Sequence, residues 1–322
     1  MEGKNLNSKF IDDFNLLKSY DDSLIPTVNP IWAAFFGLFS VFILYQIIGS
    51  LLTMAVFGFD LKNVDKNSLR LMTIAGQLLF ILLPALILSR SVFGDVSTIV
   101  RTRRLPNAKE FLLAIAGLVI LSPLFQVYIE IQNYIITKLA ENFSLFQSIK
   151  GFLDNLDKLV ENSYLDILVS KTPIETILVV IVVTVVPALC EETFFRGFVQ
   201  KSLELRLKPV WAISITSVFF AFYHFNPYGT LPLFFLSAYL GYWAYKSQSI
   251  FIPMTIHFFN NFFAVLMYLI YGEEELISAP DISKINITTS IAEFTFLFVL
   301  FVIIIVYVSN YYKKLKAEYD LS

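Results

Sequence analysis

The sequence predicts an all-α, polytopic transmembrane helical bundle with about eight transmembrane helices. Of its 322 residues, 57% are hydrophobic and 16% are charged, whereas soluble domains carry about a quarter charged residues. The apolar residues are gathered into long runs, and phenylalanine alone occupies 33 positions. Most of this chain is therefore expected to lie in lipid instead of water.

The membrane helices are predicted from apolar runs, because a helix needs about 20 mostly apolar residues to cross a bilayer. The fifth and sixth runs are short, and the brief connection between them predicts a tight helical hairpin. The eight runs are Ile31–Phe59, Leu71–Leu88, Phe111–Tyr128, Ile177–Val199, Val210–Phe225, Leu231–Tyr245, Ile250–Tyr271 and Ile291–Val308.

The polar segments divide the chain into five parts. An N-terminal segment (1–30) precedes the first transmembrane helices (31–136), a long loop (137–172), a core (173–272) and the last helix with its tail (273–322). Large apolar residues recur at helical spacing within the long loop, which predicts an amphipathic surface helix. These residues are Phe146, Ile149, Phe152, Leu153, Leu156 and Leu159.

The distribution of basic residues predicts the orientation, because cytoplasmic loops are enriched in lysine and arginine. With the N-terminus inside, 16 of the 24 basic residues fall on the inner side. Both termini are therefore predicted to be cytoplasmic. The Ile-, Lys- and Asn-rich composition, without obvious eukaryotic sorting signals, favours a bacterial plasma membrane. The net charge of -2 and the lack of a basic tract exclude a nucleic-acid partner.

Four ionisable residues interrupt apolar sequence. Both histidines of the chain, His224 and His257, fall inside predicted spans, and the adjacent Glu191 and Glu192 interrupt the fourth run. An ionised side chain at bilayer depth costs about 2.5 to 3.5 kcal/mol, so such residues point to a protein-lined functional cavity. The alternative is that the fourth helix surfaces at Glu191 and that the pair is interfacial.

Counting along the chain brings two of these residues to one level. If the fourth and fifth helices form an antiparallel pair that turns near Lys208, Glu191 lies 17 residues before the turn and His224 lies 16 residues after it. Both residues are then about 25 Å from the turn. His257 reaches the same level only if this helical hairpin extends beyond the membrane on the cytoplasmic side.

Helical spacing assigns the remaining polar residues to faces. Glu192 and Arg196 are four residues apart and can pair, which leaves Glu191 free. His257 and Asn261 share a face in the same way and can both donate hydrogen bonds to one oxygen. Pro187 removes a helical hydrogen bond and frees the carbonyl group of residue 183.

This set of residues is suited to amide hydrolysis within a membrane. A carboxylate and an imidazole can activate water, and nearby donors can stabilise an oxyanion. The sequence has neither a Gly-x-Ser-x-Gly motif for a serine nucleophile nor a His-Glu-x-x-His zinc motif. A metal such as zinc, bound by Glu191, His224 and His257, stays open if the helices converge.

Three ordered motifs resemble those of a known family. Glu191-Glu192-x-x-x-Arg196, Phe220-x-x-x-His224 and His257-x-x-x-Asn261 are similar to the signatures of the CAAX prenyl protease and bacteriocin-processing (CPBP) intramembrane proteases, including the prenyl-protein endopeptidase of the Ras-converting type. The resemblance covers about Pro173–Met267. The first three helices and the last carry no such signal.

The resemblance implies a catalytic role for Glu191, Glu192, His224, His257 and Asn261, with support from Arg196 and Phe220. Glu191 would be the general base, His257 and Asn261 the oxyanion site, and Arg196 the residue that orients the carboxylates. The family has been described both as metalloproteases and as metal-free glutamate proteases, and we favour the second description. The expected function is an intramembrane endopeptidase for a membrane-associated or lipidated peptide or protein.

Two other functions stay open. The first is a non-catalytic membrane scaffold or bacteriocin self-immunity protein. The second is a proton-coupled transporter that uses the carboxylates as proton relays. The complete set of polar motif residues favours catalysis over the scaffold, and the lack of paired halves with matching broken helices disfavours the transporter.

Overall fold

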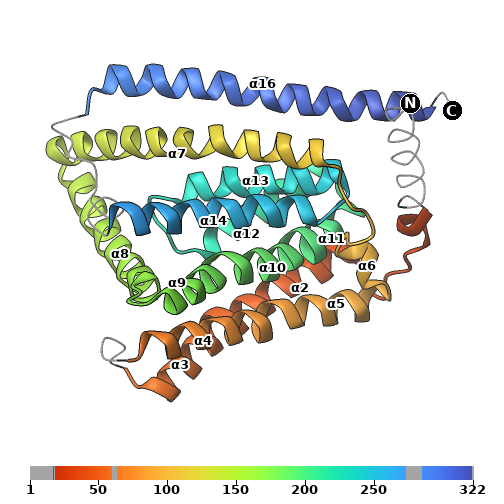
Figure 1. Cartoon of the computed structure of the whole chain (residues 1–322), viewed down its shortest axis with the longest axis horizontal. Helices are drawn as coiled ribbons and strands as arrows, with labels where there is room; N and C mark the ends of the chain where they lie inside the picture. The colour runs from red at the N-terminus through yellow and green to blue at the C-terminus, as the bar shows by residue number, and fades with distance from the viewer. Residues whose placement is uncertain (1–16, 18, 60–63, 273–284, 321–322) are drawn as a thin grey trace.

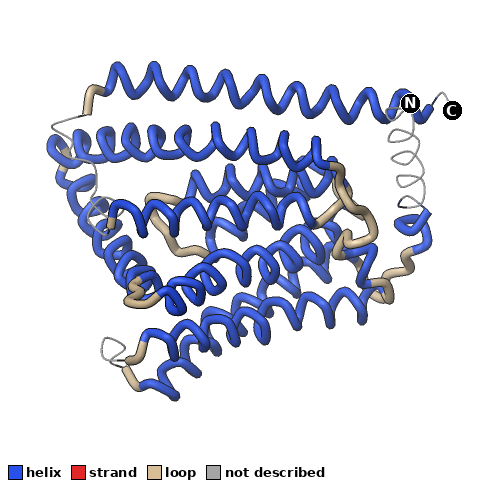
Figure 2. Tube along the Cα trace, viewed as in Figure 1, coloured by secondary structure: helices blue, strands red, loops and turns tan. Residues whose placement is uncertain are grey.

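The computed structural model describes residues 17, 19–59, 64–272 and 285–320. This part of the chain consists of helices joined by loops and contains no strand (Figure 1, Figure 2). The predicted all-α class is therefore confirmed. Most of the expected segment 1–30, and the first residues of the expected segment 273–322, lie outside the described residues.

Six helical spans of the described chain are long and apolar enough to cross a membrane. Several of them are chains of shorter helical segments joined without a loop. The first span is made of α2 (Pro30–Phe42), η1 (Ile43–Ile48) and α3 (Gly49–Phe57), and the second of α4 (Lys66–Gln77), η3 (Leu78–Leu82) and α5 (Leu83–Phe93). The third span is α7 (Ala108–Asn142), and the last two lie in α14 (Phe251–Tyr271) and α16 (Ile287–Asp320). The fourth span consists of α9 (Pro173–Val180), η4 (Ile181–Val185), α10 (Val186–Glu192), η5 (Thr193–Val199) and α11 (Gln200–Glu204).

All eight predicted runs form helices, and six of them coincide with helices that are long and apolar enough to cross a membrane. The fifth and sixth runs are α12 (Pro209–Tyr223) and α13 (Thr230–Ser247). Helix α12 has only 15 residues, which span about 22 Å, less than the thickness of the hydrocarbon core. Helix α13 has 18 residues, but it is not among the spans that meet both criteria. The two helices pack against each other, as the hairpin prediction requires.

The third helix is longer than its apolar run. Helix α7 continues through residue 136, where a domain boundary was expected, and ends at Asn142. The following helix, α8 (Ser144–Leu168), occupies the segment predicted to be amphipathic and leaves Phe152 and Leu159 63% and 65% exposed. Asp166 of α8 forms an ion pair of 2.6 Å with Lys66 of α4, which ties this exposed helix to the second span.

Four π-helical segments occur in the described chain, at η1, η3, η4 and η5. Two of them, η4 and η5, lie directly before and after α10 in the fourth span, and η3 of the second span packs against α10. Because π-helical turns are rare and are concentrated at functional sites, their clustering around α10 singles out the region of Glu191 and Glu192.

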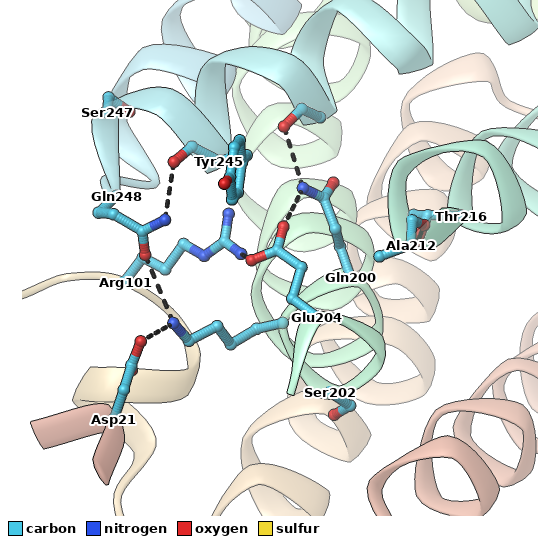
Figure 3. A network of polar contacts seen from close by, with 12 residues as sticks. Asp21, Arg101, Gln200, Ser202, Glu204, Ala212, Thr216, Tyr245, Ser247 and Gln248 are labelled. Carbon is cyan, nitrogen blue, oxygen red and sulfur yellow. Dashed lines mark hydrogen bonds and ion pairs between the residues drawn. The ribbon is translucent and has the colours of Figure 1, made fainter. Parts of the chain in front are cut away.

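A polar network joins several loops at one end of the bundle (Figure 3). The Lys201 ammonium group lies 2.6 Å from Asp21 and 3.4 Å from the amide oxygen of Gln248, and Arg101 pairs with Glu204. The C-terminal end of α16 lies at this same end of the bundle (Figure 1). The structure contains no membrane, so the cytoplasmic location of this end stays a prediction.

Candidate active site

The centre of the bundle contains a buried ionic triad around Glu192. Oxygen Oε1 of Glu192 accepts a hydrogen bond of 2.9 Å from Nη1 of Arg196 and lies 2.7 Å from Nδ1 of His257. The side chains of Glu192 and Arg196 are fully buried, and that of His257 is 4% exposed. The pairing with Arg196 is the one that helical spacing predicts. The contact with His257 joins α10 to α14, which are far apart in the sequence.

Arg196 is held in place by contacts on two other sides. Its Nη2 atom donates hydrogen bonds to the hydroxyl group of Ser237, at 2.8 Å, and to the carbonyl group of Ser237, at 3.2 Å. Its guanidinium carbon lies 4.5 Å from the centroid of the Phe220 ring, within cation–π distance. The guanidinium group therefore fixes the Glu192 carboxylate relative to both α12 and α13.

Glu191 faces His224, at the level that counting from the turn predicts. Atom Oε2 of Glu191 lies 3.9 Å from Nε2 of His224, and the two side chains are 15% and 31% exposed. Nδ1 of His224 lies 2.7 Å from the carbonyl oxygen of Phe220. Because a carbonyl oxygen only accepts hydrogen bonds, Nδ1 carries a proton. In the neutral imidazole, Nε2 is then an acceptor, and two acceptors face each other across this distance.

The environment of the Glu191 carboxylate leaves one oxygen uncompensated. Atom Oε2 is buried and has no hydrogen-bond partner among the described residues. A buried acceptor without a partner costs about 1 to 3 kcal/mol, so such a group in a native structure calls for an explanation. Its position beside a second acceptor makes it suitable for binding a molecule that donates two hydrogen bonds.

The Phe220 ring separates and supports the two histidines. Its centroid lies 4.6 Å from that of His224 and 6.0 Å from that of His257. Its backbone carbonyl is the partner of His224, and its face contacts Arg196. The supporting position expected for Phe220 therefore corresponds to contacts with three polar residues of the site.

Asn261 lies one helical turn from His257, and its amide contacts both the fourth span and its neighbour on α14. Its Nδ2 atom donates a hydrogen bond of 2.9 Å to the carbonyl group of Val183, the carbonyl that Pro187 leaves without its α-helical donor. Its Oδ1 atom accepts one of 3.1 Å from Asn260. One N–H of the Asn261 amide is left over for a further acceptor.

The structure thus joins four of the five predicted site residues in two pairs, Glu191 with His224 and Glu192 with His257. Because the two glutamates are adjacent, the pairs lie next to each other. The groove of about 290 Å³ between the first and second spans does not include any of the five residues in its lining. The expected cavity shared by all five is therefore not this groove.

The histidines and acidic residues do not form a preformed metal site. No group of three His, Cys, Asp or Glu side chains that could hold an ion was found in the described part of the chain. Nδ1 of His257 contacts Glu192, and Nδ1 of His224 contacts the Phe220 carbonyl group, so Nε2 is the ring nitrogen of each histidine that is open to an ion. The expected set of Glu191, His224 and His257 is thus not gathered as a ligand group in the described part of the chain, and we derive no step through a metal.

Several residues around the site carry no signal in the sequence. Ser237, which binds Arg196, is one of many serines in apolar segments. Gln46 of η1 donates a hydrogen bond of 2.8 Å to the carbonyl group of Tyr223, next to His224. Its partner is 177 residues away and contributes a backbone atom, so no local spacing rule could have found this pair.

The comparisons with known proteins agree with the resemblance of the motifs. Residues 173–263 match the family described as Type II CAAX prenyl endopeptidase Rce1-like. No curated protein and no solved structure matches the chain. The matched segment begins at the first residue of α9 and contains both glutamate–histidine pairs, Arg196, Phe220 and Asn261. Residues 173–263 are therefore similar to the Rce1-like family of type II CAAX prenyl endopeptidases, and the rest of the chain lies outside the match.

Proposed function

We propose that this protein is an intramembrane endopeptidase that hydrolyses a peptide bond with a water molecule activated by Glu191 and His224. The observation that carries the proposal is the distance of 3.9 Å between Oε2 of Glu191 and Nε2 of His224. Two acceptors at this separation can share one water molecule that donates an O–H to each, with hydrogen bonds of about 2.8 Å. The water oxygen then presents a lone pair to a substrate carbonyl carbon.

In the first step, the water oxygen forms a bond to the carbonyl carbon while Glu191 accepts one of its protons. His224 accepts the other hydrogen bond and orients the attack. The carbonyl oxygen becomes an oxyanion. Collapse of this tetrahedral intermediate breaks the C–N bond, and Glu191 returns its proton to the leaving nitrogen. The products are a carboxyl group and an amine, and the enzyme returns to its initial state.

His257 and Asn261 supply the donors for the oxyanion in this scheme. Because Nδ1 of His257 is directed to Glu192, its Nε2 atom can donate only in the imidazolium form. In that form, His257 and Arg196 are two cations beside the two glutamates. The spare N–H of Asn261 provides the second donor. Each such donor contributes about 100- to 1,000-fold to the rate.

The substrate class follows from the family and from the surroundings of the site. We propose a membrane-associated or lipidated peptide or protein as substrate, because Glu191, Glu192 and His257 lie on helices long and apolar enough to cross a bilayer. We also propose a bacterial plasma membrane as the location. The reaction described here needs no metal, although a divalent ion such as zinc is an outcome that the experiments must distinguish.

The test is cleavage of a lipidated, fluorogenic peptide by the purified protein in detergent or liposomes. Glu191→Gln keeps the shape of the side chain and removes the base, so we expect it to lower kcat by at least about 100-fold. Glu141→Gln is the matched control, because Glu141 is an exposed partner of Lys138 at the end of α7, and it should leave kcat unchanged. A cellular phenotype that survives Glu191→Gln would favour the scaffold or immunity function.

A further inference from the structure

The residue before His224 is held by the first span, which lies outside the segment matched to the family. The Tyr223 carbonyl group accepts a hydrogen bond of 2.8 Å from Nε2 of Gln46. The Tyr223 hydroxyl group donates a hydrogen bond to the carbonyl group of Leu38. Both polar groups of this one residue are thus bound by α2 and η1.

The residue after His224 is held by the same span. Phe225 has a φ of +48°, in the left-handed region that residues other than glycine rarely adopt. Its ring centroid lies 6.0 Å from that of Phe42, which also lies 5.3 Å from the ring of Tyr223. Phe42 and Gln46 are four residues apart, and together they contact both chain neighbours of the histidine.

These contacts occur where α12 ends and the backbone direction of His224 is decided. His224 is the C-terminal capping residue of α12, and the chain turns away at Phe225. A residue at such a position has few helical hydrogen bonds to hold it. The direction of its side chain therefore depends on the Phe220 carbonyl group, which Nδ1 contacts, and on what holds the residues on either side.

We infer that the first span, Pro30–Phe57, positions His224 toward Glu191, and that Gln46 is the positioning residue. This inference rests on the proposed function for its effect on activity, but not for its effect on the geometry of His224. The hydrogen bond from Gln46 fixes the peptide group that precedes His224. Without it, the imidazole samples directions in which its Nε2 atom no longer shares a water molecule with Glu191.

The kinetic test compares Gln46→Met with Gln132→Met. Methionine keeps the length of glutamine and removes its donor. Gln132 is the matched control, because its Nε2 atom donates a similar hydrogen bond, of 3.2 Å, to the carbonyl group of Tyr228, four residues beyond His224.

We expect Gln46→Met to lower kcat by about 10- to 100-fold, since small misplacements of catalytic groups have effects of this size. KM should change by less than about twofold. Gln132→Met should change neither constant by more than about twofold. Equal losses in both variants would overturn the inference, because they would reflect a general loosening of the bundle.

The second test needs no activity, because the chain contains only two histidines. In protein labelled with ¹⁵N-histidine, the imidazole signals of His224 and His257 can be assigned with a His224→Gln variant. We expect Gln46→Met to shift or broaden the His224 signals and to leave those of His257 in place. Unchanged His224 signals would overturn the inference even if activity fell. If the unsubstituted protein cleaves no peptide, the proposed function fails, and the spectra alone decide on Gln46.

A second pair of variants keeps the inference testable if Gln46→Met does not fold. Tyr223→Phe removes only the hydrogen bond to Leu38, and Tyr239→Phe removes a similar buried bond of 2.7 Å to the carbonyl group of Ala114, on α7. We expect the His224 signals to change in Tyr223→Phe and not in Tyr239→Phe. The opposite pattern would overturn the role of the first span.

Discussion

Nδ1 of His257 lies 2.7 Å from Oε1 of Glu192, and the same oxygen atom accepts a hydrogen bond from Arg196. Glu192 thus joins two potential cations at a point from which water is excluded. The desolvation of these charges is expensive, and their mutual contacts offset that cost only while every partner is present. The triad is therefore sensitive to the loss of any one member.

We predict that Glu192→Leu lowers the free energy of unfolding by about 3 to 5 kcal/mol, because it leaves the buried Arg196 without its counter-ion. Arg196→Leu alone should cost a similar amount, whereas the double variant should recover a large part of the loss. Thermal or denaturant unfolding in one detergent would measure all three. A double variant whose loss equals the sum of the single losses would show that the two residues are energetically independent.

The structure predicts an unusual tautomer for His224. Because Nδ1 contacts the Phe220 carbonyl group at 2.7 Å, the neutral ring should carry its proton on Nδ1 and leave Nε2 bare. The ¹⁵N chemical shifts and one-bond N–H couplings of the labelled imidazole distinguish the two tautomers. A proton on Nε2 of the neutral ring would contradict the proposal that Nε2 accepts a hydrogen bond from the attacking water.

Orientation can be tested with single cysteines, because the one native cysteine, Cys190, is buried. Lys208 and Lys171 are both exposed and lie at the two ends of the fourth span. If the end near Lys208 is cytoplasmic, Lys208→Cys should react with an impermeant maleimide only after the cells are opened. Lys171→Cys should react in intact cells. The reverse pattern would invert the predicted topology.

The helices themselves could be predicted from the sequence, because the need to satisfy every backbone group in lipid leaves little choice but long apolar helices. Their ends could not be predicted as well. Helix α7 extends to Asn142, since residues beyond its apolar run, such as Glu130 and Lys138, form helices readily outside the bilayer. The two short helices, α12 and α13, could also be predicted, and their contact with each other follows from the brief connection between them.

Within the site, the contacts that follow from helical geometry could be predicted, and those between distant segments could not. The Glu192–Arg196 pair follows from a spacing of four residues, and the level of Glu191 and His224 follows from counting to a shared turn. The contact between Glu192 and His257 spans 65 residues of sequence. It depends on how α14 packs, which no local pattern determines.

Asn261 offers a variant whose effects on stability and rate can be separated. Asn261→Ala removes the donor to the Val183 carbonyl group, and an unsatisfied buried acceptor costs about 1 to 3 kcal/mol. If the spare N–H also binds the oxyanion, kcat should fall by about 100- to 1,000-fold. Val183 contributes only its backbone, so Pro187→Ala provides the control: it adds an N–H near that carbonyl group and keeps Asn261. A loss of stability without a loss of kcat would assign Asn261 to structure alone.

The requirement for a metal gives the clearest division between the two chemistries that the residues allow. If zinc were used, its protein ligands would lie about 2.0 to 2.2 Å from the ion and would leave one position for water. Asn261 donates a hydrogen bond to a carbonyl group, and an uncharged amide one turn from His257 is better suited to donate a hydrogen bond than to bind zinc. We therefore expect stringent chelation of the purified enzyme to leave at least about half of its activity, while Glu191→Ala and His224→Ala each lower kcat by about 100-fold or more.

The assay should include a zinc peptidase of known sensitivity, so that effective chelation is demonstrated in the same detergent. Loss of activity on chelation, followed by recovery with one equivalent of zinc, would assign the reaction to the metal and would require the site to rearrange around it.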